Sequence, residues 1–356
     1  MKTHESNALQ FRRPRMKLLA RCAALLVLIL VALPQVESAE VLSGVKSRGQ
    51  LRCGVSEDIP GFSERDANGY WRGLEVDFCR AVAAAVLNDP EKVEFVPLQT
   101  TARFPALQTR RVDLLLANTT WTLTREAVLR VRFPGILLYD GQGFMVAAAA
   151  KVATLAELDG AIICVEKGTT HQRTLEAHFK ANGRSVKPLL MASAQKAAAA
   201  LFAGQCQAYT ADSGELAAMR LRAPGGPGSF VILPERISRE PLSPVVWGGD
   251  PEWATVIRWV LNILILGEEY GVTRDRIDEE IRDNRNPLLR QDPYEGKIIA
   301  QALGIEPQWG IRALRAVGNY GEVFERNLGR NSPLKIERGL NRLWMHGGLH
   351  YSPAID

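Results

Sequence analysis

The sequence lacks the signature motifs of several large enzyme classes. Its 356 residues contain neither a GxxxxGKS/T phosphate-binding loop nor a GxSxG nucleophile elbow. The GxG at residues 141–143 has no third glycine and no strand directly before it, so it is not a dinucleotide fingerprint. Histidine is scarce, and His346 and His350 have two glycines between them and no cysteine or carboxylate close by. We therefore expect no catalytic residue, no cofactor and no metal site.

Net charge is also low once the first 39 residues are set aside. The whole chain has 44 Lys+Arg and 39 Asp+Glu, a formal charge of +5. Residues 1–39 hold six basic and two acidic residues, so they account for +4 of this surplus. The remainder of the chain is almost neutral, and a broad basic surface for nucleic acid is therefore not expected.

Long hydrophobic runs are absent as well. The apolar segment at residues 22–33 has only twelve residues; it follows a basic stretch that ends at Arg21 and precedes Pro34 and several small residues. Twelve residues are too few to span a bilayer as a helix. The layout is typical of a secretory signal peptide cleaved near residues 38–40, with an uncleaved N-terminal anchor as the alternative.

Cysteine is sparse, and export changes how it is interpreted. Loss of the signal peptide would remove Cys22 and leave four cysteines in an oxidising compartment. Three pairings are possible. Cys53 and Cys79 fall in one prospective lobe and Cys164 and Cys206 in the other, so we favour the pairs 53–79 and 164–206, with four free thiols as the alternative.

From residue 50 onward, short apolar strands alternate with helical segments, which is typical of α/β proteins. Two such series follow one another, so we expect two lobes. The expected strands lie at 51–55, 93–97 and 112–117 in the first series and at 161–165, 186–190, 208–211 and 230–233 in the second. The expected domains are a signal peptide at 1–39, lobe 1 at 40–143, lobe 2 at 144–243, and at 244–356 a return to lobe 1 followed by a helical extension.

The most informative window is LLLANTTWTLTR, residues 114–125. A strand ends there, the polar residues Asn118 and Thr120 follow, and a helix begins with Thr122 or Thr124 as N-cap and Arg125 in its first turn. Hydroxyls, backbone amides and an arginine one turn into a helix are suited to grip a carboxylate. The alternative is an ordinary capped helix with a surface arginine.

The second series has two similar strand-to-helix junctions. Gly168 permits close backbone approach, and Thr169 and Thr170 present hydroxyls and amides at a helix start. Asp212 follows a strand just before another helix, although each junction alone would also suit a plain turn and cap. Together, an anion-binding site on one lobe and a carboxylate on the other match the two charges of a free α-amino acid.

These motifs resemble those of the general L-amino-acid-binding periplasmic proteins, a branch of the family 3 substrate-binding proteins of ABC transporters. The resemblance runs from about residue 41 to the C-terminus. It implies a type II periplasmic-binding-protein fold with two hinged lobes and a C-terminal helical extension, and a monomeric, non-catalytic periplasmic protein that docks on an inner-membrane permease. The motifs that carry it are LRCGVSEDIPGFS (51–63), RFPALQTRRVDLLLANTTWTLTRE (103–126), YDGQGFMV (139–146), GTT (168–170), VGNYGEVFERN (317–327) and SPLKIERGLNRLW (332–344).

The resemblance also assigns roles to single residues. The resemblance implies that Arg125 holds the ligand α-carboxylate, together with Thr120 and the Asn118 backbone. The disulfide pairing of such proteins also matches the pairs favoured above. It also implies that Thr169 and Thr170 close on the ligand from the second lobe and that Asp212 binds the α-ammonium. The wall around the ligand's side chain is assigned to Ser56, Glu57, Tyr70 and Trp71. Arg103 is assigned as the cation that binds an acidic side chain.

The chain departs from the family pattern near the expected pocket. Ala117 stands where an arginine is usual, and Ala211-Asp212-Ser213 replaces a Thr-Asp-Arg-like string. We therefore expect a shifted or narrower range of polar or acidic amino acids. Two other functions are weighed: a cyclohexadienyl dehydratase-like enzyme, which the GTT loop disfavours because it continues into His171 rather than a carboxylate, and a soluble ligand-sensing adaptor.

Overall fold

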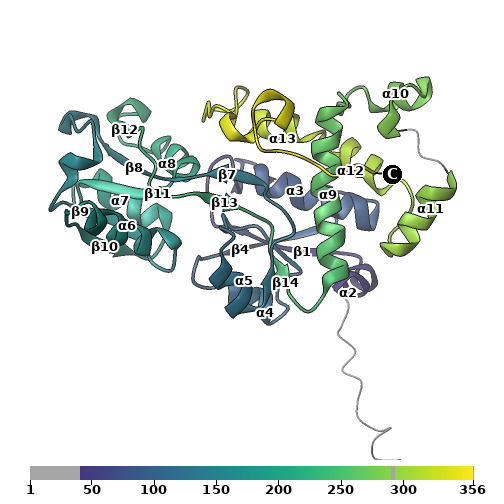
Figure 1. Cartoon of the computed structure of the whole chain (residues 1–356), viewed down its shortest axis with the longest axis horizontal. Coiled ribbons are helices and arrows are strands. Elements are labelled where there is room, and N and C mark those ends of the chain that lie inside the picture. Colours follow the sequence, from purple (N-terminus) through teal and green to yellow (C-terminus); the bar gives the residue numbers. More distant parts are fainter. Residues whose placement is uncertain (1–40, 290–292, 356) are drawn as a thin grey trace, which may run out of the picture. The chain divides into compact units, whose positions relative to one another are not determined.

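Two separate β-sheets organise the chain. The computed structural model describes residues 41–289 and 293–355, so the predicted signal peptide with its Cys22 lies outside the described residues. The first sheet has the strand order β4-β1-β5 and the second has the order β10-β9-β11-β8-β12. Figure 1 shows each sheet with its own helices, which confirms the predicted two-lobe α/β architecture.

The first sheet is parallel and is built on β1, Leu51–Ser56. Strand β1 pairs along its whole length with β4, Val93–Leu98, and pairs at Cys53 and Gly54 with β5, Leu114–Leu115. Because parallel strands end at one edge, Ser56, Leu98 and the segment after Leu115 come together there. The helices and the short hairpin of this part of the chain are α2 (Val41–Arg48), α3 (Leu74–Leu87), α4 (Arg103–Gln108), α5 (Leu123–Leu129), β2 (Glu64–Arg65) and β3 (Trp71–Arg72).

The second sheet is mixed. Strands β9, Ile162–Glu166, and β11, Ala208–Asp212, are parallel neighbours, and β8, Gln142–Ala147, runs antiparallel to β11. Glu166 and Asp212 are the last residues of β9 and β11, so these two carboxylates share one edge of the sheet. The remaining elements are β10 (Lys187–Met191), β12 (Phe230–Ile232), α6 (Thr170–Ala181), α7 (Ala194–Phe202) and α8 (Ser213–Arg220).

A two-stranded ribbon lies between the two sheets in Figure 1. Strand β7, Leu138–Asp140, leads into β8, and its antiparallel partner β13, Glu240–Leu242, carries the chain back after β12. The return continues into β14, Val246–Trp247, which pairs with β6, Val131–Arg132. Both crossings between the sheets therefore run side by side through β7 and β13.

The C-terminal part of the chain is helical and packs on the first sheet's helices. Helix α9, Pro251–Glu269, begins where the Asp250 side chain accepts a hydrogen bond from the Trp253 backbone N–H at 2.8 Å. The Trp253 indole is fully buried and donates to the Asp113 backbone carbonyl at 2.9 Å. The helices that follow are α10 (Ile277–Asp283), α11 (Pro293–Ala302), α12 (Trp309–Val317), which packs against α3, and α13 (Tyr320–Asn327).

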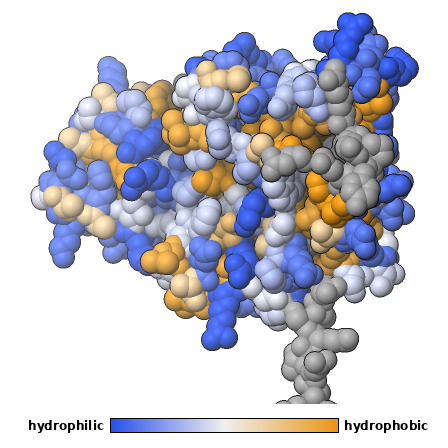
Figure 2. All heavy atoms as spheres, turned by 45° about the vertical axis from the view of Figure 1, so that its right-hand side comes forward, coloured by the Kyte–Doolittle hydropathy of each residue, from blue (hydrophilic) through white to orange (hydrophobic). Residues whose placement is uncertain are grey.

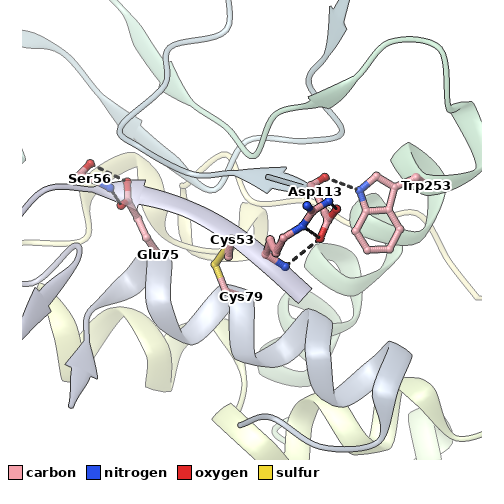
Figure 3. The surroundings of a disulfide bond; sticks show 7 residues. Cys53, Ser56, Glu75, Cys79, Asp113 and Trp253 are labelled. Atoms are coloured by element: carbon pink, nitrogen blue, oxygen red, sulfur yellow. Dashed lines mark hydrogen bonds and ion pairs between the residues drawn. A yellow bond between two sulfur atoms is a disulfide. The ribbon is translucent and has the colours of Figure 1, made fainter. Parts of the chain in front are cut away.

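Both predicted disulfides are present. Cys53 on β1 joins Cys79 on α3, as Figure 3 shows, and Cys164 on β9 joins Cys206 just before β11. Each bridge therefore ties a helix or loop to a strand of one sheet. The bridged residues are 26 and 42 positions apart, and closing loops of this length in the unfolded chain stabilises the fold by about 3–4 kcal/mol per bridge.

We expect the double variant Cys164→Ala/Cys206→Ala to lose about 4 kcal/mol of unfolding free energy, because its unfolded chain is no longer restrained. Urea denaturation under oxidising conditions measures this loss. The wild-type protein with its thiols reduced is the control and should be less stable than the double variant, which keeps one bridge. Equal stability of oxidised wild type and double variant would contradict the prediction.

Within residues 41–289 and 293–355, no helix is both long enough and apolar enough to cross a lipid bilayer. On the face drawn in Figure 2, hydrophobic residues gather in separate patches among hydrophilic ones.

Candidate functional site

One pocket takes its walls from the carboxyl ends of strands in both sheets. Ser56 at the end of β1 and Asn118 after β5 lie on the first-lobe wall. Glu166 and Asp212, which end β9 and β11, lie on the facing wall. Clefts at the carboxyl ends of strands are a usual place for ligands in α/β proteins, so this pocket is the candidate site.

Arg125 lies in the first-lobe wall of the pocket. Helix α5 begins with Thr122 as its N-cap, whose hydroxyl oxygen accepts from the Arg125 backbone N–H at 3.2 Å. The Arg125 side chain is buried, and its Nη1 donates to the Thr120 carbonyl at 2.7 Å. Burial and the neighbouring Arg103 lower the pKa of Arg125 to about 9. Among the described residues no carboxylate forms an ion pair with this guanidinium, which leaves it available to an anionic ligand.

Glu75, at the start of α3, holds the first-lobe wall in place. Its carboxylate accepts from the backbone N–H of Asn118 at 2.7 Å and from that of Ser56 at 3.0 Å, the second of which is drawn in Figure 3. Burial raises the pKa of Glu75 to about 7 despite these hydrogen bonds. Glu75 was not among the predicted site residues, because nothing in the helix sequence LEVDFCRAV distinguishes it from the other charged residues there, Asp77 and Arg80.

The second-lobe wall begins with the turn that precedes α6. Gly168 has a φ of +84°, a left-handed conformation that suits glycine, and Thr169 is the N-cap residue of the helix. The Thr169 hydroxyl donates to the Glu166 carbonyl at 2.8 Å, and the Thr170 hydroxyl donates to a Glu240 carboxylate oxygen at 3.1 Å. Both threonines line the pocket.

Asp212 is paired with His171, a residue that the sequence analysis did not assign to the site. Asp212 Oδ1 lies 3.1 Å from His171 Nε2, and both side chains are buried. Burial alone would lower the pKa of His171, but neighbouring carboxylates, Asp212 first, raise it to about 9. With Glu240 these two residues are the candidate metal ligands among the described residues, because their donor atoms lie within 4.8 Å of one another. The His171–Asp212 contact is also a complete buried hydrogen-bonded pair without a metal.

Arg103 and Glu166 are further buried charges of the pocket. Arg103 Nη1 donates to the carbonyl oxygens of Ala117 at 2.7 Å and Asn118 at 3.3 Å. Its buried Nε has no hydrogen-bond partner. Glu166 belongs to the facing wall, and burial raises its pKa although the attraction of Arg103 acts in the opposite direction.

The structure separates the residues predicted for the side-chain wall. Ser56 and Glu57 line the pocket, but Tyr70 and Trp71 line a different surface hollow. Tyr70 is 66% exposed, and Trp71 packs on Phe95 at a ring separation of 5.6 Å. The short hairpin of β2 and β3 turns these two aromatic residues away from the strand ends, which corrects their assignment to the pocket wall.

Contacts between the lobes occur at the pocket rim. Gln195, near the start of α7, lines the pocket and donates to the backbone carbonyl oxygens of Glu57 and Asp58. Arg222, just beyond α8, makes two hydrogen bonds to the Asp58 carboxylate, at 2.8 and 3.0 Å. These contacts hold the two walls together beside the pocket.

Comparison with known proteins places this geometry in a family. The profile of the bacterial extracellular solute-binding proteins, family 3, matches residues 51–289. The general L-amino acid-binding periplasmic protein AapJ of Rhizobium johnstonii is 43% identical over 320 residues, which is 89% of this chain and 93% of that protein. The glutamate/glutamine/aspartate/asparagine-binding protein BztA of Rhodobacter capsulatus is 43% identical over 318 residues, 89% of this chain and 94% of that protein.

A solved structure agrees with these sequence matches. The ABC transporter periplasmic binding protein of Brucella ovis, with glutathione bound, is 44% identical and superposes with a TM-score of 0.84. The match covers 88% of this chain and 99% of that structure. This likeness confirms the predicted periplasmic-binding-protein fold, and the relatives are named as binding proteins, as the prediction of a non-catalytic protein expects. The chain belongs to family 3 of the bacterial extracellular solute-binding proteins.

Proposed function

We propose that this protein is the periplasmic binding component of an ABC importer and captures free L-amino acids. The observation that carries the proposal is the presence of buried Arg125 and buried Asp212 in the walls of one pocket. The names of AapJ and BztA and the transporter assignment of the Brucella protein support the same class of function.

In this proposal the pocket binds both charges of the amino acid's backbone. Arg125 forms two parallel hydrogen bonds with the α-carboxylate, because a guanidinium matches the geometry of a carboxylate. Thr120, the Asn118 backbone, and Thr169 and Thr170 from the opposite wall add hydrogen bonds. Asp212 accepts from the α-ammonium through Oδ2, since Oδ1 is already held by His171. Charges that leave water need such partners, so an uncharged analogue should bind poorly.

The proposed ligand range is polar and acidic amino acids. Arg103 lines the pocket and offers its guanidinium to the end of a polar side chain, while Ser56 and Glu57 line the same pocket. The four amino acids in the name of BztA fall in this range. Ala117 brings no cation of its own to the pocket, so Arg103 is the proposed cation for the ligand's side chain.

A thermal-shift panel of the twenty amino acids tests the function. The sample is mature protein freed of bound ligand, and glutathione is added as a separate arm because the Brucella structure contains it. A ligand at about 100 times its Kd should add about 2.7 kcal/mol to the unfolding free energy, a shift of several degrees. A panel in which no amino acid raises the melting temperature would contradict the proposal. Turnover of prephenate or arogenate would instead favour the dehydratase-like enzyme.

The placement in the cell and in the transporter is part of the same proposal. We propose a cleavable signal peptide at residues 1–39, export to the periplasm as a monomer, and docking on an inner-membrane permease. The proposed lobes comprise residues 40–143 with the return at 244–356, and residues 144–243. The hinge between them is then the β7–β13 ribbon, where both connections cross together.

A further inference from the structure

The pocket contains a second pair of opposite charges besides Arg125 and Asp212. Arg103 is the first residue of α4 and is 4% exposed, and Glu166 is the last residue of β9 and is 6% exposed. Both line the pocket, from different lobes, and Arg103 acts on Glu166 through its charge. Among the described residues they form no ion pair within 4.0 Å, so two buried groups of opposite sign face the pocket without meeting.

Arg103 has an unused donor. Its Nη1 is held by the backbone carbonyl oxygens of Ala117 and Asn118, which fixes the guanidinium against the first-lobe wall. Its Nε is buried and has no hydrogen-bond partner. The surface of this Nε is closed off, so the rest of the guanidinium is the part that lines the pocket. Because Arg103 lines the pocket and forms no ion pair among the described residues, this wall favours a ligand atom that accepts a hydrogen bond.

Glu166 presents the opposite chemistry. When it is ionised its carboxylate only accepts hydrogen bonds, and one acceptor is used by the Thr100 side chain. Burial raises the pKa of this carboxyl above its usual range. The charged and titratable groups that act on it are Arg103, His171, Asp212, Glu215 and Tyr209.

A primary carboxamide complements this pair of groups. Its oxygen accepts from the Arg103 guanidinium, and its NH₂ group donates to the ionised Glu166. A side-chain carboxylate only accepts hydrogen bonds, so it is attracted by the Arg103 guanidinium but repelled by an ionised Glu166. If Glu166 carries a proton, its O–H donates to the ligand carboxylate and the opposition is removed.

We propose that Arg103 and Glu166 recognise the end of the ligand's side chain, so that the pocket binds a carboxamide directly and a carboxylate together with one proton on Glu166. This inference rests on the proposed function and adds to it a ligand class and a specificity-determining residue. It predicts that one pocket accepts both glutamine and glutamate but couples only glutamate to proton uptake.

Isothermal titration of glutamine and glutamate at pH 6, 7 and 8 tests the inference. Binding that requires one proton weakens by up to about tenfold per pH unit. We therefore expect glutamate affinity to fall at least tenfold between pH 6 and 8, with less than a threefold change for glutamine. At pH 8, titrations in buffers of different ionisation enthalpy should give close to one proton taken up per glutamate and none per glutamine.

Two substitutions identify the group that takes the proton. In Glu166→Gln the amide can donate to a ligand carboxylate without a proton, so glutamate affinity should become independent of pH while glutamine affinity stays within tenfold. In Glu215→Gln the glutamate affinity should depend on pH as it does in the wild type, although burial raises the pKa of Glu215 to about 8 as well. Glu176→Gln, on the exposed side of α6, is the matched control and should behave as wild type.

The outcomes separate this inference from the proposed function. Equal pH slopes for glutamate and glutamine, or a glutamate slope that persists in Glu166→Gln, would overturn the inference alone. The inference would also be overturned if the pH dependence of glutamate affinity disappeared only in Glu215→Gln. It would be overturned as well if neither glutamate nor glutamine bound while other amino acids did. Failure of all twenty amino acids in the thermal-shift panel would instead overturn the function on which the inference rests.

Discussion

Arg125→Ala is expected to reduce amino-acid affinity by roughly 10²–10⁴-fold. The substitution removes two charge-assisted hydrogen bonds to the α-carboxylate, each worth about 1.5–3 kcal/mol. The unliganded protein should keep its stability to within about 1 kcal/mol, because burial of this unpaired guanidinium is itself unfavourable, as its pKa of about 9 indicates. Calorimetric titration and urea denaturation measure the two quantities on the same sample.

Two further variants sharpen this result. Arg125→Lys keeps the charge but cannot form parallel hydrogen bonds, so its affinity should lie between those of wild type and Arg125→Ala. Arg173→Ala removes an exposed arginine of α6 that does not line the pocket, and it should bind within threefold of wild type. Wild-type affinity in Arg125→Ala would refute the role of this residue in ligand binding.

The stability of the ligand-free protein is expected to fall as pH rises from about 6 to 9. The pKa of His171 is raised from its ordinary 6.5 to about 9 in the folded protein. Its contribution is therefore complete below pH 6.5 and is lost as pH rises through 9, a change of about 3 kcal/mol. Burial also raises the pKa of Glu75 to about 7 and of Glu215 to about 8, and these shifts act in the same direction.

Urea denaturation at pH 6, 7, 8 and 9 measures this dependence. His171→Asn should remove the part that belongs to the His171–Asp212 pair, so that wild type loses about 3 kcal/mol more than the variant over this range. His346→Asn, at an exposed position near the C-terminus, is the control and should follow wild type. Identical pH profiles for wild type and His171→Asn would show that this pair does not stabilise the fold.

The fold and the central part of the site were predictable because their signals are local. A strand, a short polar segment and a capped helix follow one another around Arg125, so the sequence itself brings these groups together. Asp212 ends a strand in the same way. The disulfides were predictable since Cys53 and Cys79, like Cys164 and Cys206, lie in neighbouring elements of one lobe.

The residues that were missed depend on contacts between distant parts of the chain. Glu75 contacts the Asn118 backbone, which is 43 positions away, and His171 contacts Asp212, 41 positions away. Neither contact has a pattern within one window of sequence. Tyr70 and Trp71 were assigned to the wall because the family resemblance places such residues there. Their direction is set by the β2–β3 hairpin, which a single sequence does not reveal.

The rim contacts of Asp58 have a consequence for release as well as capture. Arg222 and Gln195 touch no ligand in the proposed binding mode, yet they join the two pocket walls. If the proposed lobes open and close, these contacts favour the closed arrangement and so lower the apparent Kd. The Arg222 and Asp58 side chains are 35% and 57% exposed, and such a pair contributes at most about 1 kcal/mol, or roughly fivefold in the closed population. In the proposed function, a contact of this strength lengthens ligand residence but is weak enough to break when docking on the proposed permease separates the two walls.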